Sequence, residues 1–347
     1  MSPSIRFPEF TGEWKKCKIE DITDAVSSGK SKNHFSNGEY NLYGSTGIIG
    51  RTDKALYDGK LVLVARVGAN AGFLQIINEP CGITDNTLIL KPKGIDAFYL
   101  YYFLQHFNLN RLIFGSGQPL ITGGMLKKVK VSLGTISEQS KIVKFLSLLD
   151  ERIATQVRLI DRLQSLMIGI RHRIINEAKG KIVCLCEVSD IYQPQTISSA
   201  DLTETGYPVY GANGIIGHYT SYNHEAEQVC ITCRGNTCGG VNYTKSKSWI
   251  TGNAMVVNVD RYQNIVSKRY LYHYLSNCDF NSIISGSGQP QIVRAPLAKF
   301  KIILPTVMQQ YKIAHCLDVI QNKINVNSNI LNLLIRQKQY LLRKMFI

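Results

Sequence analysis

The chain has 347 residues, of which 44% are hydrophobic, and its 40 Lys and Arg outnumber its 25 Asp and Glu to give a formal net charge of +15. This length and apolar content exclude an intrinsically disordered chain and allow two domains with separate cores. The positive excess favours a polyanionic partner, most simply nucleic acid; a membrane protein is not expected, because no apolar run reaches ~18 residues and no signal-peptide core is found. Nine cysteines in such a chain indicate the reducing cytoplasm rather than a disulfide framework.

One unit occurs twice along the sequence. Its first copy contains Leu42–Gly50 and its second contains Val209–Gly217, and both segments include Tyr-Gly-x-x-Gly-Ile-Ile-Gly. The period is far longer than that of a solenoid repeat, so the repetition predicts a duplicated domain. Three further pairs follow in the same order: Arg66–Gly72 with Arg234–Gly240, Thr84–Thr87 with Thr251–Ala254, and Gly115–Pro119 with Gly286–Pro290.

Each copy predicts the same elements in the same order. Two apolar segments rich in β-branched residues predict strands separated by glycine-rich turns. A short helix rich in Tyr and Leu follows, and a last strand leads into a long helix. These elements fall at 60–66, 87–90, 98–107 and 129–131 in the first copy, and at 229–234, 255–259, 268–275 and 300–304 in the second.

Two long helices are expected, one in mid-chain and one at the C-terminal end. From Ser137 to Ala178 apolar residues recur at spacings of three and four, which is the pattern of a narrow stripe on a helix about 60 Å long. The same rhythm runs from Val307 onward, and the entry 306–313 matches 135–142. A helix of this length in mid-chain needs a partner, so we expect the two helices to pair antiparallel.

Polar residues on these helices allow two interpretations. The stripe of the second helix is interrupted at Asn327 and Lys338. An Asn within a coiled-coil stripe fixes register at a cost in stability, and a merely solvated Asn is the alternative. The basic residues expected on the outer faces either face solvent or dock a partner: Lys141, Lys144, Arg158, Arg162, Arg171 and Arg173.

The predicted fold class is α+β, with two duplicated mixed α/β domains joined by two long antiparallel helices that form a coiled-coil spacer. The two domains are expected to be related by an approximate two-fold axis. The predicted boundaries are 1–134 for the first domain, 135–179 for the central helix, 180–305 for the second domain and 306–347 for the C-terminal helix. Two similar basic domains at a fixed separation suit the reading of two short DNA stretches with an unread gap between them.

The two copies differ in the loops that would contact DNA. Residues 28–34 have their counterpart near 193–198, and residues 51–54 have theirs at 218–221. Different loop chemistry on one scaffold predicts different half-sites and hence an asymmetric target. Asn, Gln, Arg and Lys read base edges, whereas Lys, Ser, Thr and Tyr mainly hold phosphates. The candidate DNA-binding residues are Lys30, Lys32, Asn33, His34, Arg51, Lys54, Arg66, Asn70, Gln193, Gln195, His218, Tyr219, Arg234, Asn236, Lys245 and Lys247.

Arg66 and Arg234 precede glycine-rich turns and are expected to be equivalent in the two copies. Two roles are open for both side chains, because a guanidinium in this place can cap the turn or contact a DNA phosphate. Asn86 and Asn253 are expected to satisfy turn backbone rather than to read a base.

Motifs for metal and nucleotide chemistry are incomplete. Cys230 and Cys233 lack the remaining ligands of a zinc site and would face opposite sides of a strand, so no metal is expected. The Gly-x-Gly of each copy is followed by Gln-Pro and not by a dinucleotide-binding helix, and no phosphate-binding Gly-x-x-x-x-Gly-Lys-Ser/Thr occurs. Catalytic and cofactor-binding residues are therefore not assigned.

These residues resemble the specificity subunit of type I restriction-modification systems. The opening Ile5–Trp14, the paired Tyr-Gly-x-x-Gly-Ile-Ile-Gly segments, the paired Gly-Ser-Gly-Gln-Pro turns and the two Gln-x-Lys-Ile helix entries are similar to its recognition domains and spacer helices. The resemblance covers essentially the whole chain.

The resemblance implies a non-catalytic chain that recognises an asymmetric bipartite site on double-stranded DNA. It implies two modification subunits, which bind S-adenosylmethionine and methylate adenine, and restriction subunits, which use ATP and Mg. No cofactor is implied on this chain. Two alternatives remain open: a detached specificity half of a methyltransferase-nuclease system with catalysis on another chain, and a coiled-coil adaptor protein that does not bind DNA.

Overall fold

The computed structural model describes residues 3–32, 38–113, 119–286 and 288–347. The chain forms two compact units. Unit 1 comprises Met1–Val157 and Asn329–Ile347, and unit 2 comprises Arg158–Ser328. Both long helices therefore contribute residues to both units, which the predicted division into domains and spacer helices did not consider.

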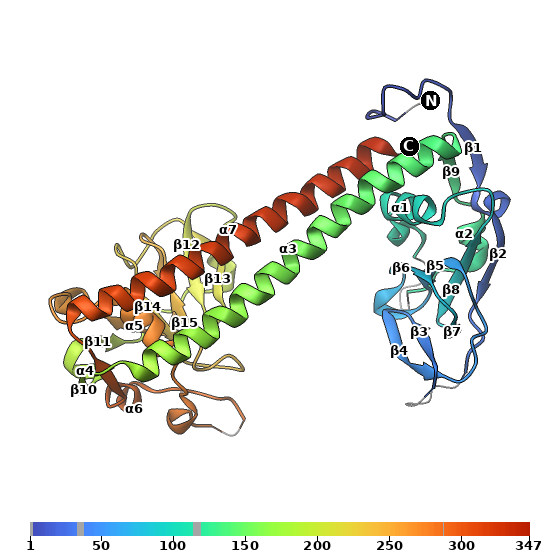
Figure 1. Ribbon diagram of the computed structural model, residues 1–347. Coiled ribbons are helices and arrows are strands. Elements are labelled where there is room, and N and C mark those ends of the chain that lie inside the picture. The colour runs from blue at the N-terminus through green and yellow to red at the C-terminus, as the bar shows by residue number, and fades with distance from the viewer. Residues whose placement is uncertain (1–2, 33–37, 114–118, 287) are drawn as a thin grey trace. The chain divides into compact units, whose positions relative to one another are not determined.

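Unit 1 contains short sheets, small helices and parts of both long helices (Figure 1). Its described strands are β1 (Lys15–Lys18), β2 (Thr23–Ser28), β3 (Tyr40–Gly44), β4 (Gly47–Thr52), β5 (Lys60–Ala65), β6 (Leu74–Asn78), β7 (Cys81–Ile83), β8 (Thr87–Pro92) and β9 (Lys130–Leu133). Its smaller helices are η1 (Ile19–Ile22), η2 (Gly68–Asn70), α1 (Ala97–Phe107), η3 (Leu109–Leu112) and α2 (Gly123–Lys127).

Unit 2 contains the same kinds of element. Its described strands are β10 (Lys181–Cys184), β11 (Asp190–Tyr192), β12 (Tyr207–Gly211), β13 (Gly214–Tyr219), β14 (Val229–Thr232), β15 (Val241–Tyr243), β16 (Trp249–Ile250), β17 (Ala254–Asn258) and β18 (Lys301–Leu304). Its smaller helices are α4 (Leu185–Val188), η4 (Ser199–Asp201), η5 (Asp260–Tyr262), α5 (Lys268–Leu275), η6 (Asn281–Ile283) and α6 (Arg294–Ala298). The long helices are α3 (Ile136–Glu177) and α7 (Val307–Met345).

The two units have the same sheet topology. The four-stranded sheet β2-β8-β5-β6 of unit 1 corresponds to β11-β17-β14-β15 of unit 2, and the three-stranded sheet β4-β3-β7 corresponds to β13-β12-β16. The pair β1-β9, which leads into α3, corresponds to β10-β18, which leads into α7. The predicted fold class of two duplicated mixed α/β domains with two long helices is confirmed.

The backbone hydrogen bonds correct the alignment of the two copies at one place. The N–H of Arg66 donates to the carbonyl of Asn86 at 3.0 Å, and the N–H of Cys233 donates to the carbonyl of Asn253 at 3.0 Å. Arg66 is therefore equivalent to Cys233, one residue before Arg234. The prediction of equivalent arginines is wrong, because both stand before glycine-rich turns in the sequence but occupy different positions of the ladder.

Each four-stranded sheet buries both of its faces, since successive strand residues point to opposite sides. In unit 1, Val62 and Val64 of β5 pack toward α1, whereas Leu61 and Leu63 pack toward the three-stranded sheet. The sheet of unit 2 is divided in the same way between two cores. This arrangement explains the fully apolar strands of the sequence.

Cys230 and Cys233 follow the same rule and belong to different cores. Burial raises the pKa of the Cys230 thiol to about 12 and also raises that of Cys233. Because zinc binds the thiolate, this burial disfavours metal at both positions. Within the described residues, no group of three or more His, Cys, Asp or Glu could hold a metal ion.

In unit 1 the beginning of α3 packs against the end of α7. Ile142, Leu146 and Leu149 of α3 share one core with Leu334 and Leu341 of α7. The stripe predicted from the sequence is thus buried here, and the helices run in opposite directions. Replacing a fully buried Leu such as Leu146 by Ala in such a core costs about 2–5 kcal/mol.

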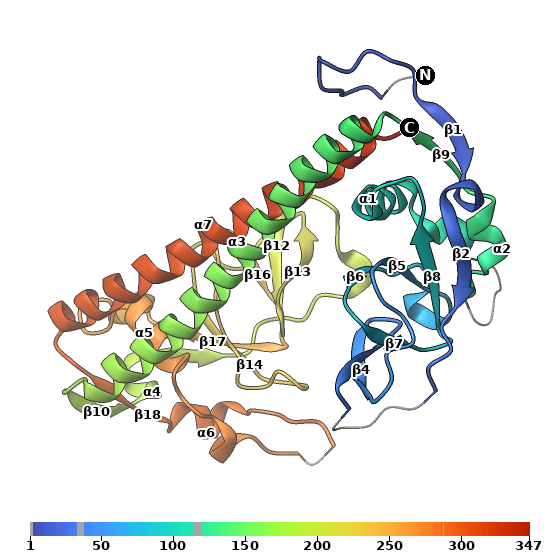
Figure 2. The ribbon, with the colours of Figure 1, turned by 45° about the vertical axis from the view of Figure 1, so that its right-hand side comes forward.

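Within unit 2 the end of α3 packs against the beginning of α7, again antiparallel (Figures 1 and 2). Met167 of α3 forms a core with Leu317 and Ile324 of α7. Arg171 is not on the outer face as expected, because its side chain is partly buried and this burial lowers its pKa. The stripe also has a gap in unit 1, where Val157 is 40% exposed.

The two polar interruptions of the α7 stripe behave differently. Lys338 lies 2.6 Å from the carboxylate of Asp150 on α3, with 16% of its side chain exposed, and its Nζ lies 5.3 Å from the ring centroid of Tyr102. Asn327 is partly buried and its amide donates to the carbonyl of Lys323 at 2.7 Å. Lys338 therefore links the two helices within unit 1 by an ion pair.

Over the described residues, none of the helices combines the length and the apolar character needed to cross a membrane.

Candidate nucleic-acid interface

In unit 1, three predicted lysines surround one hollow. Lys30 and Lys32 follow strand β2, Lys54 follows strand β4, and all three are exposed. The rest of the lining includes Ser31, Thr52, Asp53 and Leu56. Three exposed ammonium groups beside two largely buried hydroxyl residues suit phosphate oxygens, and Asp53 is the acidic group among the lining residues.

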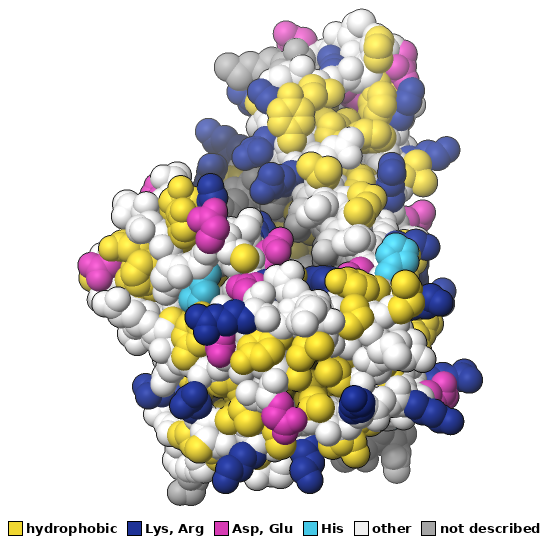
Figure 3. All heavy atoms as spheres, turned by 90° about the vertical axis from the view of Figure 1, so that its left-hand side faces the viewer, with side chains coloured by type: hydrophobic (Ala, Val, Ile, Leu, Met, Phe, Trp, Pro, Cys, Tyr) yellow, Lys and Arg dark blue, Asp and Glu magenta, His cyan; other side chains and the backbone are white. Residues whose placement is uncertain are grey.

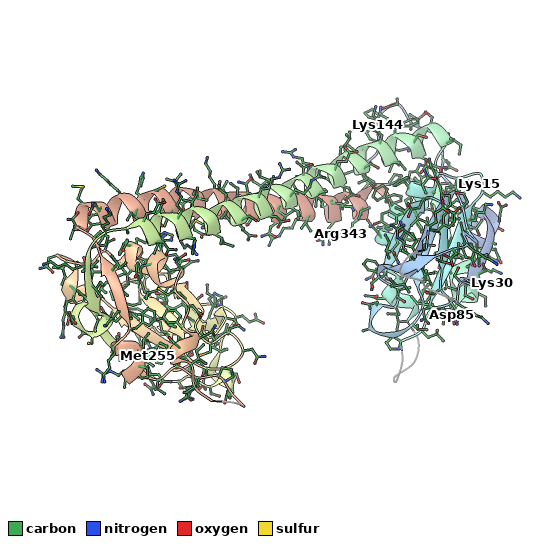
Figure 4. The ribbon with its side chains drawn as sticks, turned by 60° about the horizontal axis from the view of Figure 1, so that its bottom comes forward. Lys15, Lys30, Asp85, Lys144, Met255 and Arg343 are labelled. Atoms are coloured by element: carbon green, nitrogen blue, oxygen red, sulfur yellow. The ribbon has the colours of Figure 1, made fainter. Side chains whose placement is uncertain are left out.

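A second hollow adjoins the first and shares Lys30, Ser31 and Lys32 with it. Its other lining residues are Gly29, Ile49, Thr84, Asp85 and Asn86. Figure 4 shows Lys30 and Asp85 at the same end of unit 1. Gly29 is required there, because a Cβ atom would lie 2.3 Å from the carbonyl oxygens of Ile83 and Thr84.

The guanidinium of Arg66 contacts one residue of the second hollow, Asp85. Its Nη1 lies 3.5 Å from the carbonyl oxygen of Asp85, while its Nε is buried without a hydrogen-bond partner in the structure. The side chain is partly buried, so of its two proposed roles this geometry favours support of the 84–86 turn.

The other described candidates of unit 1 do not line the two hollows that contain the lysines. Arg51 is exposed on β4, and its Nη1 donates to the carbonyl of Glu39 at 3.0 Å. Asn70 is exposed in a separate hollow with Gln105, Asn108 and Asn110 near the end of α1. Asn33 and His34 lie outside the described residues.

In unit 2, the pairing of strands places Gln195 where unit 1 has Lys30. Ser27 pairs with Ile89 and Tyr192 pairs with Val256, and the two loops run on from these equivalent pairs. Gln195 is exposed. Gln193 is exposed too, but its amide donates to the carbonyl of Gly252 and so ties the loop to the neighbouring turn.

His218 in unit 2 occupies the position of Arg51, as the β12–β13 and β3–β4 registers show. His218 and Tyr219 are partly buried. The Tyr219 ring packs edge-to-face against Trp249, with ring centroids 5.2 Å apart. An imidazole and an aromatic face thus replace the guanidinium and hydroxyl of unit 1 at the same place.

The remaining candidates of unit 2 are exposed and come from two loops. Arg234 and Asn236 lie in the turn after β14, and Lys245 and Lys247 lie in the loop between β15 and β16. Lys247 has a positive φ of 50° and its Nζ lies 3.8 Å from Glu225. The structure therefore does not gather the basic residues of unit 2 as it gathers Lys30, Lys32 and Lys54.

The sequence did not indicate Ile49 as a candidate for the site, and Asn86 was expected to serve only a turn. The backbone of Asn86 does serve the turn, because its carbonyl accepts the N–H of Arg66, but its side chain is exposed and lines the second hollow. The signal that could have found both is the repeat itself, since Ile49 and Asn86 stand at repeated positions beside the variable loops.

The positive charge is spread over the surface. Both units contain more Lys and Arg than Asp and Glu. On the face drawn in Figure 3, Lys and Arg side chains are scattered between hydrophobic patches and outnumber the acidic ones. Scattered cations support long-range attraction of a polyanion without defining a single site.

A family model for the type I restriction modification DNA specificity domain matches residues 11–165 and 178–336, which is most of the chain. The chain belongs to this family. Its two matched stretches follow the duplication seen in the sheets. Specificity subunits of this family recognise DNA and are not catalytic, so the hollows of unit 1 are interpreted as binding surfaces rather than active sites.

Two curated specificity subunits are similar to this chain. The EcoprrI type I restriction enzyme specificity subunit of Escherichia coli is 31% identical over 148 residues, covering 41% of this chain and 36% of that subunit. This match thus spans little more than a third of that relative. A putative type I restriction enzyme specificity subunit of Haemophilus influenzae is 21% identical over 357 residues, covering 94% of this chain and 92% of its own length.

Two solved structures share the fold. The S subunit of a type I restriction-modification system from M. genitalium aligns with a TM-score of 0.72 at 18% identity, covering 100% of this chain and 99% of its own. A chain from a structure of complex assembly and conformational transition of the type I R-M system aligns with a TM-score of 0.58 at 15% identity, covering 97% of this chain and 98% of its own.

Proposed function

We propose that this specificity subunit recognises one asymmetric, bipartite sequence on double-stranded DNA, with each unit reading one half-site. The observation that carries the proposal is the pair of sheets with the same strand order but different side chains at equivalent register positions. Lys30 of unit 1 corresponds to Gln195 of unit 2, and Arg51 corresponds to His218. One scaffold with two sets of polar side chains suits two different base sequences.

We further propose that the long helices serve as a coiled-coil spacer that fixes the gap between the half-sites. Support comes from the buried stripes of α3 and α7 and from their antiparallel pairing within each unit. Neither helix contains a proline in its interior. Continuous helices without such a break are stiff enough to transmit a fixed length.

The partners we propose are two modification subunits, which bind S-adenosylmethionine and methylate adenine, and restriction subunits, which use ATP and Mg. Exposed apolar side chains on the long helices support a protein-binding surface, since large apolar patches rarely face water without a partner. In unit 1 these include Phe145, Leu148, Leu333 and Tyr340, and in unit 2 they include Leu166, Ile168, Tyr311, Val319 and Val326.

The proposal assigns no cofactor to this chain and a cytoplasmic location to the complex, where its DNA substrate is found. All nine cysteines are free thiols in the structure, in keeping with that location.

The decisive experiment expresses the chain together with its modification subunits in a host without other methylation and sequences the methylated DNA. A single asymmetric motif with two defined halves and an undefined gap is expected. A palindromic or continuous motif would contradict two unlike readers on one chain.

Purification from the native host separates the alternative with catalysis on another chain. Co-elution of modification subunits supports the proposal, whereas co-elution of a methyltransferase-nuclease fusion supports a detached specificity half. Binding to random duplex DNA over a salt series tests the adaptor alternative, for which the slope of log affinity against log salt would be near zero.

A further inference from the structure

Each unit exposes a pair of isoleucines at the tip of an equivalent β-hairpin. In the β3–β4 hairpin of unit 1, Ile48 and Ile49 are 57% and 52% exposed. In the β12–β13 hairpin of unit 2, Ile215 and Ile216 are each 47% exposed. Both hairpins shift register at the same place, before the pairs Tyr43–Ile48 and Tyr210–Ile215.

Glycines hold both tips in the same shape. Gly47 and Gly214 begin the second strand with φ of +129° and +84°, where a side chain would be strained. A Cβ atom on Gly44 would lie 2.8 Å from the Cγ2 of Ile49, and the equivalent atom on Gly211 would lie 2.9 Å from that of Ile216. The second isoleucine of each pair therefore packs over a glycine, and the first is also exposed.

The surroundings of the tips are polar and, in unit 1, basic. Ile49 lines the same hollow as Lys30 and Lys32, and Arg51 follows on the same strand. In unit 2, the Asn242 amide oxygen would lie 3.9 Å from a Cβ on Gly214, and His218 follows on the tip strand. In unit 1, an apolar tip beside cations fits a polyanion that also presents apolar surface, and unit 2 has the same apolar pair in polar surroundings.

Duplex DNA has this combination. Its phosphates carry the negative charge, and its grooves expose the thymine methyl groups and the edges of the base pairs. Apolar side chains, isoleucine among them, are used by many proteins to press against or between base pairs.

We propose that the Ile48–Ile49 and Ile215–Ile216 tips contact the apolar surface of base pairs inside a groove, one tip at each half-site. The inference rests on the proposed reading of DNA and deepens it. The tips have the same chemistry in both units, whereas the loops beside them differ. The tips therefore position the duplex at either half-site, and the neighbouring loops select its sequence.

The test measures DNA affinity of the complex with modification subunits for variants at the first isoleucine, because the second supports the hairpin. Ile48→Ser and Ile215→Ser should each weaken binding roughly tenfold, which corresponds to ~1.4 kcal/mol of lost apolar contact. Ile48→Leu and Ile215→Leu keep the apolar contact and should retain affinity. Ile182→Ser is the matched control, since Ile182 is 69% exposed on β10.

Salt dependence and site dependence sharpen the test. The Ser variants should leave the slope of log affinity against log salt unchanged, because no phosphate contact is lost. Each Ser variant should also weaken binding by a similar factor for other half-site sequences. This is measured by exchanging the loops of the unit, so that it reads other bases, while the serine is kept at the tip.

Three outcomes would overturn the inference. Unchanged affinity in the Ser variants, with a reduced salt slope in Lys30→Ala/Lys32→Ala, rejects the tips but leaves DNA reading intact. If affinity and salt slope are unchanged both in the Ser variants and in Lys30→Ala/Lys32→Ala, the inference is rejected together with the proposed function. Loss of modification subunits from Ser variants, seen as a lower mass of the complex, would identify the tips as a protein contact instead.

Discussion

Unit 1 and unit 2 have the same sheet topology, but they differ in the polar side chains that join helix α1 or α5 to the long helices. In both units a buried tyrosine anchors the helix, because Tyr99 donates to the carbonyl of Ser132 and Tyr270 donates to that of Ile303. One turn further along, the side chains differ. Unit 1 has Tyr102, whereas unit 2 has His273.

Each of these two residues binds an aspartate of a long helix that is also paired with a cation. Tyr102 donates to Asp150 at 2.8 Å, and Asp150 is also paired with Lys338. In unit 2 the Nε2 of His273 lies 2.8 Å from Asp318, whose two oxygens each lie 3.0 Å from the Nε of Arg269.

Burial is the largest influence on the Asp318 carboxyl and by itself would raise its pKa, but hydrogen bonds from His273 and Arg269 lower the pKa to about 2. Burial lowers the pKa of His273, which has no exposed surface. The same corner of the fold thus contains an ion pair in both units, joined by a phenol in unit 1 and by a neutral imidazole in unit 2.

The register of the scaffold is set by backbone hydrogen bonds and buried apolar groups, which both units share. Polar side chains attached to that scaffold can be exchanged without a change of strand order. Tyr102 and His273 differ in this way next to the long helices. The loops differ too, because lysines of unit 1 are replaced by uncharged residues in unit 2.

The largest effect is expected from exchanging one reader. Replacing residues 20–130 with those of another family member should change one half-site completely and leave the other half-site and the gap unchanged. Sequencing of methylated DNA from cells with the modified complex measures all three. A change in both halves would show that the units do not read independently.

A smaller effect is expected from removing the imidazole in unit 2. His273→Phe removes a hydrogen bond to the partly buried carboxylate of Asp318 and places a larger ring in a site with no exposed surface, so unit 2 should lose about 2–3 kcal/mol of stability. Tyr102→Phe is the matched change in unit 1 and should cost about 1 kcal/mol, because it removes one hydroxyl group and leaves the ring unchanged.

Hydrogen exchange with mass spectrometry reports on the two units separately and measures both changes. Equal losses in the two units would mean that the imidazole of unit 2 contributes no more than the phenol of unit 1.

The two units should also respond differently to mild acid. His273 and His224 of unit 2 and His106 of unit 1 all have a pKa lowered by burial. Near pH 6.5 these histidines therefore bind protons in the unfolded chain, whereas they stay neutral in the folded chain. Stability should fall as pH decreases below about 6.5, by up to about 1.4 kcal/mol per pH unit for each histidine.

Unit 2 should lose more than unit 1, and hydrogen exchange at pH 7.0 and 5.5 measures the difference. The groups facing His273 are Asp318, Arg269 and Arg171. Asp318 has a lowered pKa, so its contribution persists above about pH 4 and is lost only as pH falls toward 2. In His273→Phe the difference between the units at mild acid should shrink, and its persistence would exclude His273 as the cause.

The smallest effect concerns the loops. Lys30→Ala/Lys32→Ala in unit 1 should lower the magnitude of the salt slope of DNA binding by about two, since each phosphate contact contributes about 0.9. The matched change Gln195→Ala in unit 2 removes no charge and should leave the slope unchanged. Fluorescence anisotropy from low to moderate salt measures both slopes, and equal slopes for the two variants would remove the proposed contrast between the loops.

Much of the scaffold could be predicted from the sequence, because the same residues occur twice. The helix predicted at 268–275 has those bounds in the structure, and the strand predicted at 60–66 ends one residue earlier. Apolar spacing also predicted the long helices to within a residue or two, since a buried stripe leaves a regular period.

The remaining features depend on contacts between distant residues, which leave no local pattern. The Lys338–Asp150 pair looked like an interruption of a stripe, because its partner lies on another helix. Arg66 was matched to the wrong residue because residue identity was compared where only the hydrogen-bond ladder distinguishes neighbours. The DNA-binding residues remain predictions, and of these the structure brings together Lys30, Lys32 and Lys54.

The passage of α3 and α7 through both units has a consequence for synthesis on the ribosome. All residues of unit 2 have been made once Ser328 has been added, whereas the core of unit 1 needs Leu341, Leu342 and Met345. The N–H of Ile5 donates to the carbonyl of Lys344, so this hydrogen bond also forms only after Lys344 has been added. The half of the protein that is translated first is therefore the last to finish folding.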